Sequence, residues 1–495
     1  MKNEPLFELI KGMSQTEKTH FKRYSKSHSA KKVNYLNLYE LIGKQDEYNE
    51  LSLKKELGST HFAQNKKHLY LKVLESLRNY HSKHYIESQI YAHLNNFEIL
   101  FSKSLLKPAK KELSRAKTLA LKYERLSDLI KIGKYEGQVF KNENDLNQLE
   151  EHFKSYLKTT SYVNTSITIE LKVENLHLKL VQWNKSIEWV RNDGERDELI
   201  KIIKSFSFNV NDNYIGRETL AKYYYAKGIC SYLTGDFEHS FIEFKNQLSV
   251  FEANPWLKKD ESSLVKVLGN ISLLSIITKN KKFNKYKNAL NELVCKDPLN
   301  IIHQDYLKKM IYLMFLCRSE RYMDAANWLE INNRKISDSE KIIMEKNILY
   351  NEHCFMTFYK INAYLGVRNI KMALKIINNY LVNAKQELKQ DTYCLARIIN
   401  LLIHFELDNT DLLDYELSST YNYLKNKKRL YLFEEILTRF IKKAINRNSN
   451  IELNSLLLDL HSDLEELKIH PYEKVVFEFF DFVAWTERNI IKLIE

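Results

Sequence analysis

The clearest repeat pattern of the chain lies in residues 221–254, followed by Pro255, and reads AKYYYAKGICSYLTGDFEHSFIEFKNQLSVFEANP. Aromatic, apolar and small residues recur in this stretch at intervals of mostly three to four positions, which is the period of an amphipathic helix. The positions that carry the pattern are Tyr224, Gly228, Tyr232, Gly235, Phe237, Ser240, Phe244 and Leu248, followed by Pro255. The pattern predicts helix in this stretch.

The rest of the chain supports a helical fold, because it contains very few turn-forming residues. Only 11 Gly and 5 Pro occur in 495 residues, whereas average usage would give about 60 of the two together. Strands need tight turns, and tight turns usually need Gly or Pro. We therefore predict an all-α protein with more than about two-thirds helix, far above the usual third.

Residues 221–255 resemble one tetratricopeptide repeat, a pair of antiparallel helices. The resemblance assigns Gly228 and Ser240 as the small residues that let the two helices approach closely, and Gly235-Asp236-Phe237 as the turn between them. The usual Ala late in the second helix is replaced by Gln247. The match is therefore good but incomplete.

Three weaker copies of the second-helix pattern follow. They are Phe283 with Tyr286, Tyr322 with Ala325, and Ile370 with Ala373. Their successive spacings from Phe237 are 46, 39 and 48 residues, whereas a regular tetratricopeptide array has a period of about 34. The resemblance thus implies a degenerate tetratricopeptide-like solenoid.

Several longer strings are similar to an uncharacterised bacterial family of long tetratricopeptide-like proteins. The strings are Leu6 to Ile10, Ser14 to Lys22, Asn34 to Ile42, Leu402 to Leu407 and Phe479 to Phe482. The resemblance implies the fold and a cytoplasmic location, but no reaction. A helical-repeat fold hosts binding more often than catalysis, which is an inference by analogy.

The positive charge is concentrated at the start of the chain. Residues 1–135 contain 26 Lys and Arg against 14 Asp and Glu, which gives +12 of the total net charge of +13. We therefore divide the chain into a basic N-terminal helical region, residues 1–135, and a helical solenoid, residues 136–495. Such an asymmetry suggests either an acidic partner or a solvated basic face.

Basic residues cluster repeatedly in this first quarter, among aromatic residues that include Phe21, Tyr24, Tyr35 and Tyr70. Basic groups mixed with aromatic rings suit phosphate neutralisation and base stacking. The predicted basic patch consists of Lys22, Arg23, Lys31, Lys32, Lys66, Lys67, Lys72, Lys110, Lys111 and Arg115. It supports the alternative function, a nucleic-acid- or ribosome-associated protein.

Signatures of catalysis and cofactor binding are missing from the sequence. It contains no GxxxxGK[ST], GxGxxG, GxSxG or HExxH motif. His81 and His84, with Glu87 beyond, lack a further convincing zinc ligand. We therefore predict no catalytic residue, no metal and no cofactor.

Location follows from the cysteines and from the hydropathy. The five cysteines form no CxxC pair and lie in apolar helical stretches, which indicates buried thiols in a reducing compartment. The first residues carry Glu4 and Glu8, unlike a secretory signal. No uncharged apolar run is long enough to span a bilayer. We expect a cytoplasmic protein without a membrane span.

Other segments yield predictions about individual helices. Ser14 with Glu17, and Ser337 with Glu340, have the spacing of capping boxes that open helices. Residues 66–101 read as one long amphipathic helix. Residues 472–495 read as an apolar helix around most of its circumference, which is either buried by earlier helices or joins a partner or a second copy of the chain.

Together these features favour a non-enzymatic scaffold or adaptor that binds a protein partner or a peptide. In the resembled repeat, some positions of the first helix point into a groove, and a partner helix or peptide could lie there. In this chain those positions are Lys222, Tyr225, Ile229, Tyr232 and Leu233. Lys222 would meet a carboxylate of the partner, and the two tyrosines would hold its apolar side chains.

Overall fold

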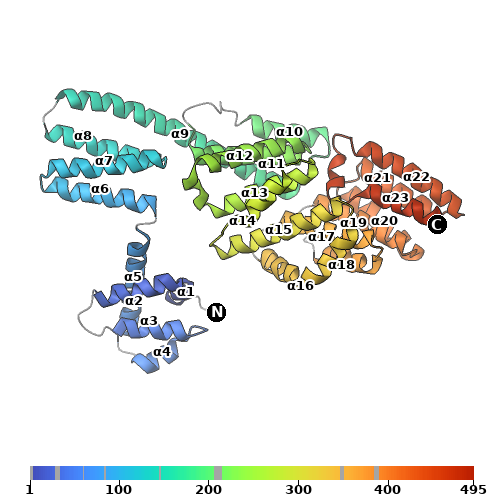
Figure 1. The fold of residues 1–495 in the computed structure, drawn as a ribbon, viewed down its shortest axis with the longest axis horizontal. Coiled ribbons are helices and arrows are strands. Elements are labelled where there is room, and N and C mark those ends of the chain that lie inside the picture. Colours follow the sequence, from blue (N-terminus) through green and yellow to red (C-terminus); the bar gives the residue numbers. More distant parts are fainter. Residues whose placement is uncertain are drawn as a thin grey trace. The chain divides into compact units, whose positions relative to one another are not determined.

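The computed structural model shows an all-α protein (Figure 1). It describes residues 4–27, 34–58, 61–82, 85–143, 146–205, 215–345, 350–383 and 390–494. Helix makes up 84% of the structure, and none of these described residues lies in a strand. The all-α prediction is confirmed.

The chain divides into two compact units, Met1–Asn164 and Thr165–Glu495. Helix α9 (Leu146–Ser186) contributes residues to both. This boundary differs from the one at residue 135, which was drawn on charge alone. The functional division at residue 135 stays a prediction.

In the first unit, the predicted capping box at Ser14 and Glu17 opens α2. The backbone N–H of Ser14 donates to Glu17 Oε2 (2.7 Å), and the N–H of Glu17 donates to Ser14 Oγ (3.3 Å). These reciprocal bonds satisfy two free amides where α2 begins.

The helices of this unit before α9 are α1 (Pro5–Gly12), α2 (Gln15–Ser27), α3 (Asn34–Lys44), α4 (Glu50–Leu57), α5 (Phe62–His81), α6 (Ile86–Ser102), α7 (Leu106–Lys122) and α8 (Leu126–Asn142).

The single helix predicted over residues 66–101 is wrong, because two helices, α5 and α6, cover this range. Tyr85, directly before α6, has extended backbone angles. The two halves also bury their apolar faces in different cores: Leu69 and Val73 lie in one cluster, and Leu94 and Phe97 in another. The apolar positions repeat at three to four residues within each half, but six residues separate Tyr80 from Ile86, so the period is interrupted at the break.

The second unit is built from consecutive helical hairpins that pack around one large apolar core. Its α-helices after α9 are α10 (Asp193–Lys204), α11 (Arg217–Leu233), α12 (Phe237–Ala253), α13 (Glu261–Ile277), α14 (Phe283–Glu292), α15 (Pro298–Arg318), α16 (Tyr322–Glu345), α17 (Tyr350–Gly366), α18 (Ile370–Asn383), α19 (Gln390–Glu406), α20 (Thr410–Asn426), α21 (Leu432–Ile445), α22 (Asn450–Leu467) and α23 (Phe482–Ile494). Two short 3₁₀ helices, η1 (Pro255–Lys259) and η2 (Lys474–Glu478), complete it.

One turn recurs between successive helices in both units. A single residue adopts the left-handed conformation, and the N–H of the next residue donates to the carbonyl five positions earlier, as from Asp236 to Ser231 (2.8 Å) and from Asn369 to Tyr364 (2.8 Å). This is the Schellman arrangement, which satisfies carbonyls at a helix end. The left-handed residues are Ser104, Glu124, Gly235, Lys279, Glu320, Arg368, Asp408 and Lys428.

The residues that the sequence pattern assigned to the turn are the first residues of four helices: α12 at Phe237, α14 at Phe283, α16 at Tyr322 and α18 at Ile370. The position three residues later is buried in each of them. Within the first of these hairpins, the backbone of Gly228 on α11 lies against α12, where Ser240 Oγ donates to the Gly228 carbonyl (2.8 Å).

This close approach predicts a cost for a side chain at Gly228. A Cβ there would lie 2.9 Å from the Phe244 ring, inside van der Waals contact. We expect Gly228→Leu to lower the free energy of unfolding by about 1–3 kcal/mol. All five tryptophans lie in residues 183–485, so tryptophan fluorescence during denaturation reports on this unit.

The matched control for this prediction is Lys245→Leu, which introduces the same side chain at an exposed position of α12. It should leave the midpoint of the denaturation curve unchanged. Equal denaturation midpoints for the Gly228 and Lys245 variants would show that α11 and α12 are not in close contact at Gly228.

Two local predictions in this unit are wrong. No helix begins near Ser337, because α16 continues through residues 337–340. Residues 472–495 are not one helix, because η2 and α23 are separated by the bend at residues 479–481. Within residues 475–485, the valine, phenylalanine and tryptophan side chains are nevertheless buried, with Phe480 1% and Trp485 0% exposed.

Among the residues that the structure describes, no helix combines the length and the apolar character needed to span a bilayer.

Candidate binding pocket

A pocket of about 300 Å³ lies within residues 165–495. Most of its lining residues come from one face each of α9, α11 and α13, while α15 and α19 contribute one residue each and α17 contributes Cys354 and Phe355. These are odd-numbered helices, the first member of each hairpin from α11 onward, and the even-numbered helix α12 adds Phe244. The lining residues on the three main helices are His177, Leu180 and Val181 on α9, Tyr225, Ala226, Ile229, Tyr232 and Leu233 on α11, and Lys266, Asn270, Leu273, Leu274 and Ile277 on α13.

The structure brings four of the five predicted groove residues together in this pocket: Tyr225, Ile229, Tyr232 and Leu233. Their spacing of three to four residues places them on one face of α11. The ring of Tyr225 lies 5.9 Å from that of Phe244, measured between centroids. Whether a partner binds there stays a prediction.

The fifth predicted residue, Lys222, lies outside the pocket. Its Nζ lies 2.9 Å from Glu174 Oε1 and 3.1 Å from Glu218 Oε1. The ammonium group therefore already has two carboxylate partners within the chain, which argues against the role that the resemblance assigned to it.

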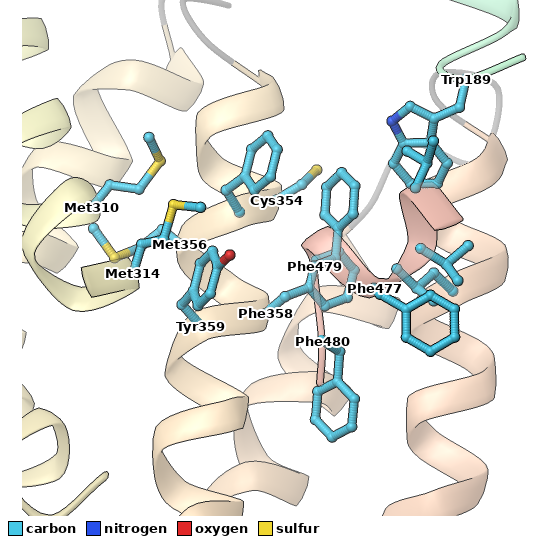
Figure 2. Packing of buried hydrophobic residues seen from close by; sticks show 14 of the residues in the cluster. Trp189, Met310, Met314, Cys354, Met356, Phe358, Tyr359, Phe477, Phe479 and Phe480 are labelled. Carbon is cyan, nitrogen blue, oxygen red and sulfur yellow. The ribbon is translucent and has the colours of Figure 1, made fainter. Parts of the chain in front are cut away.

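The floor of the pocket is aromatic, and the sequence did not reveal it. Phe479, after η2, stacks on Phe355 of α17 with ring centroids 4.4 Å apart and an interplanar angle of 11°. The ring of Trp189 lies 4.5 Å away on the other side. Figure 2 shows Phe479 between Trp189 and the part of α17 that carries Cys354 and Phe358. Three segments far apart in the chain thus form one wall.

The loop that carries Trp189 is held to the start of α19 by reciprocal hydrogen bonds. Glu188 accepts from the backbone N–H of Thr392 (2.7 Å) and from its hydroxyl (2.9 Å). In return, the N–H of Glu188 donates to Asp391 Oδ2 (3.1 Å). All three residues are buried, so these bonds fix the position of the loop.

A buried arginine fixes the same loop from the other side. Arg191 donates to both carboxylate oxygens of Glu434 (3.1 and 2.9 Å) and to Glu473 Oε2 (2.5 Å). Its guanidinium group also lies 4.5 Å from the ring centroid of Tyr431. Burial raises the pKa of Glu434, and Arg191 opposes that shift. This ion cluster joins the loop to α21 and to the segment before η2.

The mouth of the pocket carries one lysine that has no direct partner. Among the residues that the structure describes, the ammonium group of Lys266 has no hydrogen-bond or ion-pair partner. Partial burial lowers the pKa of His177, across the mouth on α9, and the charges of Lys266 and Lys222 lower it further. His177 is therefore neutral at pH 7, and Lys266 supplies the positive charge at the mouth.

Most of the cysteine thiols are shielded from solvent. Four of the five free cysteines are buried, and burial raises the pKa of Cys230 and of Cys317 to about 12. A protonated, buried thiol is a poor nucleophile. The described ranges contain no cluster of three His, Cys, Asp or Glu side chains that could hold a metal ion. His81 instead pairs with Glu17 (2.6 Å), and His84 lies outside the described residues.

The predicted basic patch lies in the first unit, where most of its described members have acidic partners. Lys31 and Lys32 lie outside the described residues. The ion pairs of the others are Lys22 with Glu40, Lys66 with Glu4 and Glu50, Lys72 with Glu75, Lys110 with Glu143, and Arg115 with Glu112. Arg23, Lys67 and Lys111 are exposed and have no ion pair to another described residue.

The aromatic residues among these lysines are mostly engaged inside the unit. Phe21 and Tyr35 are buried, and the Tyr24 hydroxyl donates to Glu75 (2.5 Å). Tyr70 is exposed. Buried rings are not available to stack on bases, so the patch offers less to a nucleic acid than its composition suggested.

The chain was also compared with known proteins. It matches no protein-family model, no curated protein and no solved structure. The function of the pocket therefore has to be inferred from its own residues.

Proposed function

We propose that residues 165–495 form a degenerate tetratricopeptide-like solenoid that acts as a non-enzymatic scaffold, and that a protein partner inserts an apolar segment into the pocket. The observation that carries the proposal is the lining of the pocket by the first helix of successive hairpins. In a solenoid, equivalent helices of successive repeats form one extended surface, and that surface is where such proteins bind their partners.

Two further observations support the repeat interpretation. The same left-handed turn closes the hairpins α11–α12, α13–α14, α15–α16, α17–α18 and α19–α20. The second helix of each of the first four hairpins also has a buried residue at its fourth position, namely Ser240, Tyr286, Ala325 and Ala373. Equivalent turns and equivalent contacts are typical of repeated units, even where the repeat length varies.

The pocket predicts that its two tyrosines are needed for binding. We expect the double variant Tyr225→Ala, Tyr232→Ala to lose the partner, because both rings line the cavity. A photo-crosslinking amino acid at Val181, which is 41% exposed and lines the pocket, identifies the partner bound there. The measurement is the yield of the crosslinked partner with and without the double substitution.

The control places the same crosslinker at Tyr415, which is 69% exposed and is not a lining residue. Equal capture at Val181 and Tyr415, or unchanged capture by the double variant, would contradict the proposal. The experiment is repeated after nuclease treatment. Capture that requires nucleic acid, and that is lost in the triple variant Arg23→Gln, Lys67→Gln, Lys111→Gln, would favour the nucleic-acid alternative instead.

A further inference from the structure

The interior of the pocket determines what part of a partner can enter. Its floor consists of buried apolar side chains, among them Trp189, Leu274, Met314, Phe355 and Phe479. A cavity of about 300 Å³ is at the small end of the range for ligand sites. A cavity of this size accommodates one large apolar side chain better than a whole helix or strand of a partner.

The polar groups of the lining are distributed unevenly. The carboxylate of Glu188 is held by the backbone and the hydroxyl of Thr392. The side chains of Lys266 and Asn270, one turn apart on α13, form no hydrogen bond with another described residue. Lys266 and Asn270 can therefore act as partners on α13 for a polar group that enters with the apolar side chain.

The charge at this position favours an anion. Lys266 is the one positively charged residue among the described residues that line the pocket, since His177 is neutral at pH 7. Glu174, the acidic residue near His177, is already paired with Lys222. The positive charge of Lys266 is left for a ligand.

The chain itself shows how its hairpins hold a segment with this chemistry. Phe479 inserts its ring between Trp189 and Phe355, while the preceding Glu478 receives hydrogen bonds from Arg318 at its carboxylate and at its backbone carbonyl. The hydroxyl of Tyr359 also donates to that carbonyl (2.7 Å). An aromatic side chain next to a glutamate is thus already bound beside the pocket, with a cation at the carboxylate.

We propose that the pocket is a second binding site like the one that holds Glu478 and Phe479. It binds a partner segment in which a large apolar side chain directly adjoins a carboxylate. The apolar side chain occupies the cavity beside Phe479, and the carboxylate pairs with Lys266. The inference rests on the proposed scaffold function, because it assumes that a partner segment reaches the pocket.

The test uses two blocked dipeptides that differ only in charge: acetyl-Glu-(4-fluoro-Phe)-amide and acetyl-Gln-(4-fluoro-Phe)-amide. Their binding to the full chain is measured by fluorine NMR titration. We expect Lys266→Gln to weaken binding of the acidic peptide about two- to fivefold, which is the range for a solvent-accessible ion pair. Binding of the neutral peptide should change less than twofold.

The matched control is Lys245→Gln, which removes an exposed lysine from the neighbouring helix α12 that does not line the pocket. It should leave both affinities unchanged. Equal effects of Lys266→Gln on the two peptides, or an equal effect of Lys245→Gln, would overturn the inference, as would the absence of binding by both peptides.

The two proposals can fail separately. If neither dipeptide binds while the crosslinked partner at Val181 is retained, the scaffold proposal stands and the inferred chemistry is wrong. If the acidic dipeptide binds through Lys266 but Tyr225→Ala, Tyr232→Ala leaves partner capture unchanged, the chemistry of the pocket stands and the scaffold proposal is wrong.

Discussion

Arg191→Met should lower the free energy of unfolding of residues 165–495 by about 3–5 kcal/mol, because it leaves buried carboxylates without their cation. The side chains of Arg191, Glu434 and Glu473 are 2%, 3% and 4% exposed. Methionine fills a similar volume, so the loss reports on charge more than on packing. The measurement is chemical denaturation followed by tryptophan fluorescence.

The effect should depend on pH in a definite direction. Burial already raises the pKa of Glu434 above 4.5, and Arg191 opposes this shift. Removing Arg191 raises the pKa of Glu434 further. At pH values above the pKa of this carboxyl in the unfolded chain, folding of the variant therefore has to bury an unpaired charge, which lowers its stability. Protonation removes that penalty as the pH falls. The difference between variant and wild type should therefore be largest near pH 7 and smaller near pH 4.

Two further variants separate charge from packing. Arg321→Met breaks the ion pair between Arg321 and Asp324, and both of these side chains are 52% exposed. It should lower the free energy of unfolding by less than about 1 kcal/mol. Adding Glu434→Gln and Glu473→Gln to Arg191→Met should recover part of the lost stability, because it removes the unpaired charges. A further loss in that triple variant, or a pH-independent effect of Arg191→Met, would show that the ion cluster acts through shape alone.

The same substitution should also affect the pocket. Arg191 holds the loop that carries Glu188 and Trp189, and both of these residues line the cavity. A loop that is released from α21 no longer fixes the aromatic floor. We therefore expect weaker binding of both fluorinated dipeptides to Arg191→Met, in contrast to the charge-selective effect of Lys266→Gln.

The helical hairpins could be predicted because they depend on neighbouring residues. The helix starts at Phe237, Phe283, Tyr322 and Ile370 follow from a local pattern of aromatic, aliphatic and small residues. The turns were harder to find, since Gly235 is the one glycine among the eight left-handed turn residues. Asp, Ser, Lys, Glu and Arg occupy the other positions, so glycine spacing gives no guide to them.

The pocket could be predicted only on the side formed by α11. Tyr225, Ile229 and Tyr232 share one helical face, and that periodicity is visible in the sequence. Trp189 and Phe479 reach the same cavity from segments that are 290 residues apart, and no local pattern encodes such a contact. The burial of Arg191 was equally hidden, because arginine is seldom buried unless paired, and its partners are more than 240 residues away.

Phe479→Ala should cost about 3–5 kcal/mol, the range for deleting a buried aromatic side chain. The ring is 2% exposed and contacts Phe355, Trp189 and Phe358, with centroids 4.4, 4.5 and 5.9 Å away. The cavity left behind would adjoin the pocket, so the walls have little means of collapsing onto it. Denaturation followed by tryptophan fluorescence measures the loss.

The control for this loss is Tyr415→Ala, which deletes an aromatic ring that is 69% exposed and should change stability by no more than about 0.5 kcal/mol. The size of the stability loss in Phe479→Ala shows whether the segment around η2 is held by apolar packing or by its ion pairs. A loss in the expected range means that the segment is part of the core and that the pocket has a fixed floor. A loss near that of the control would mean that the segment is held by its ion pairs alone, so that a partner carrying the same Glu-Phe chemistry could take its place.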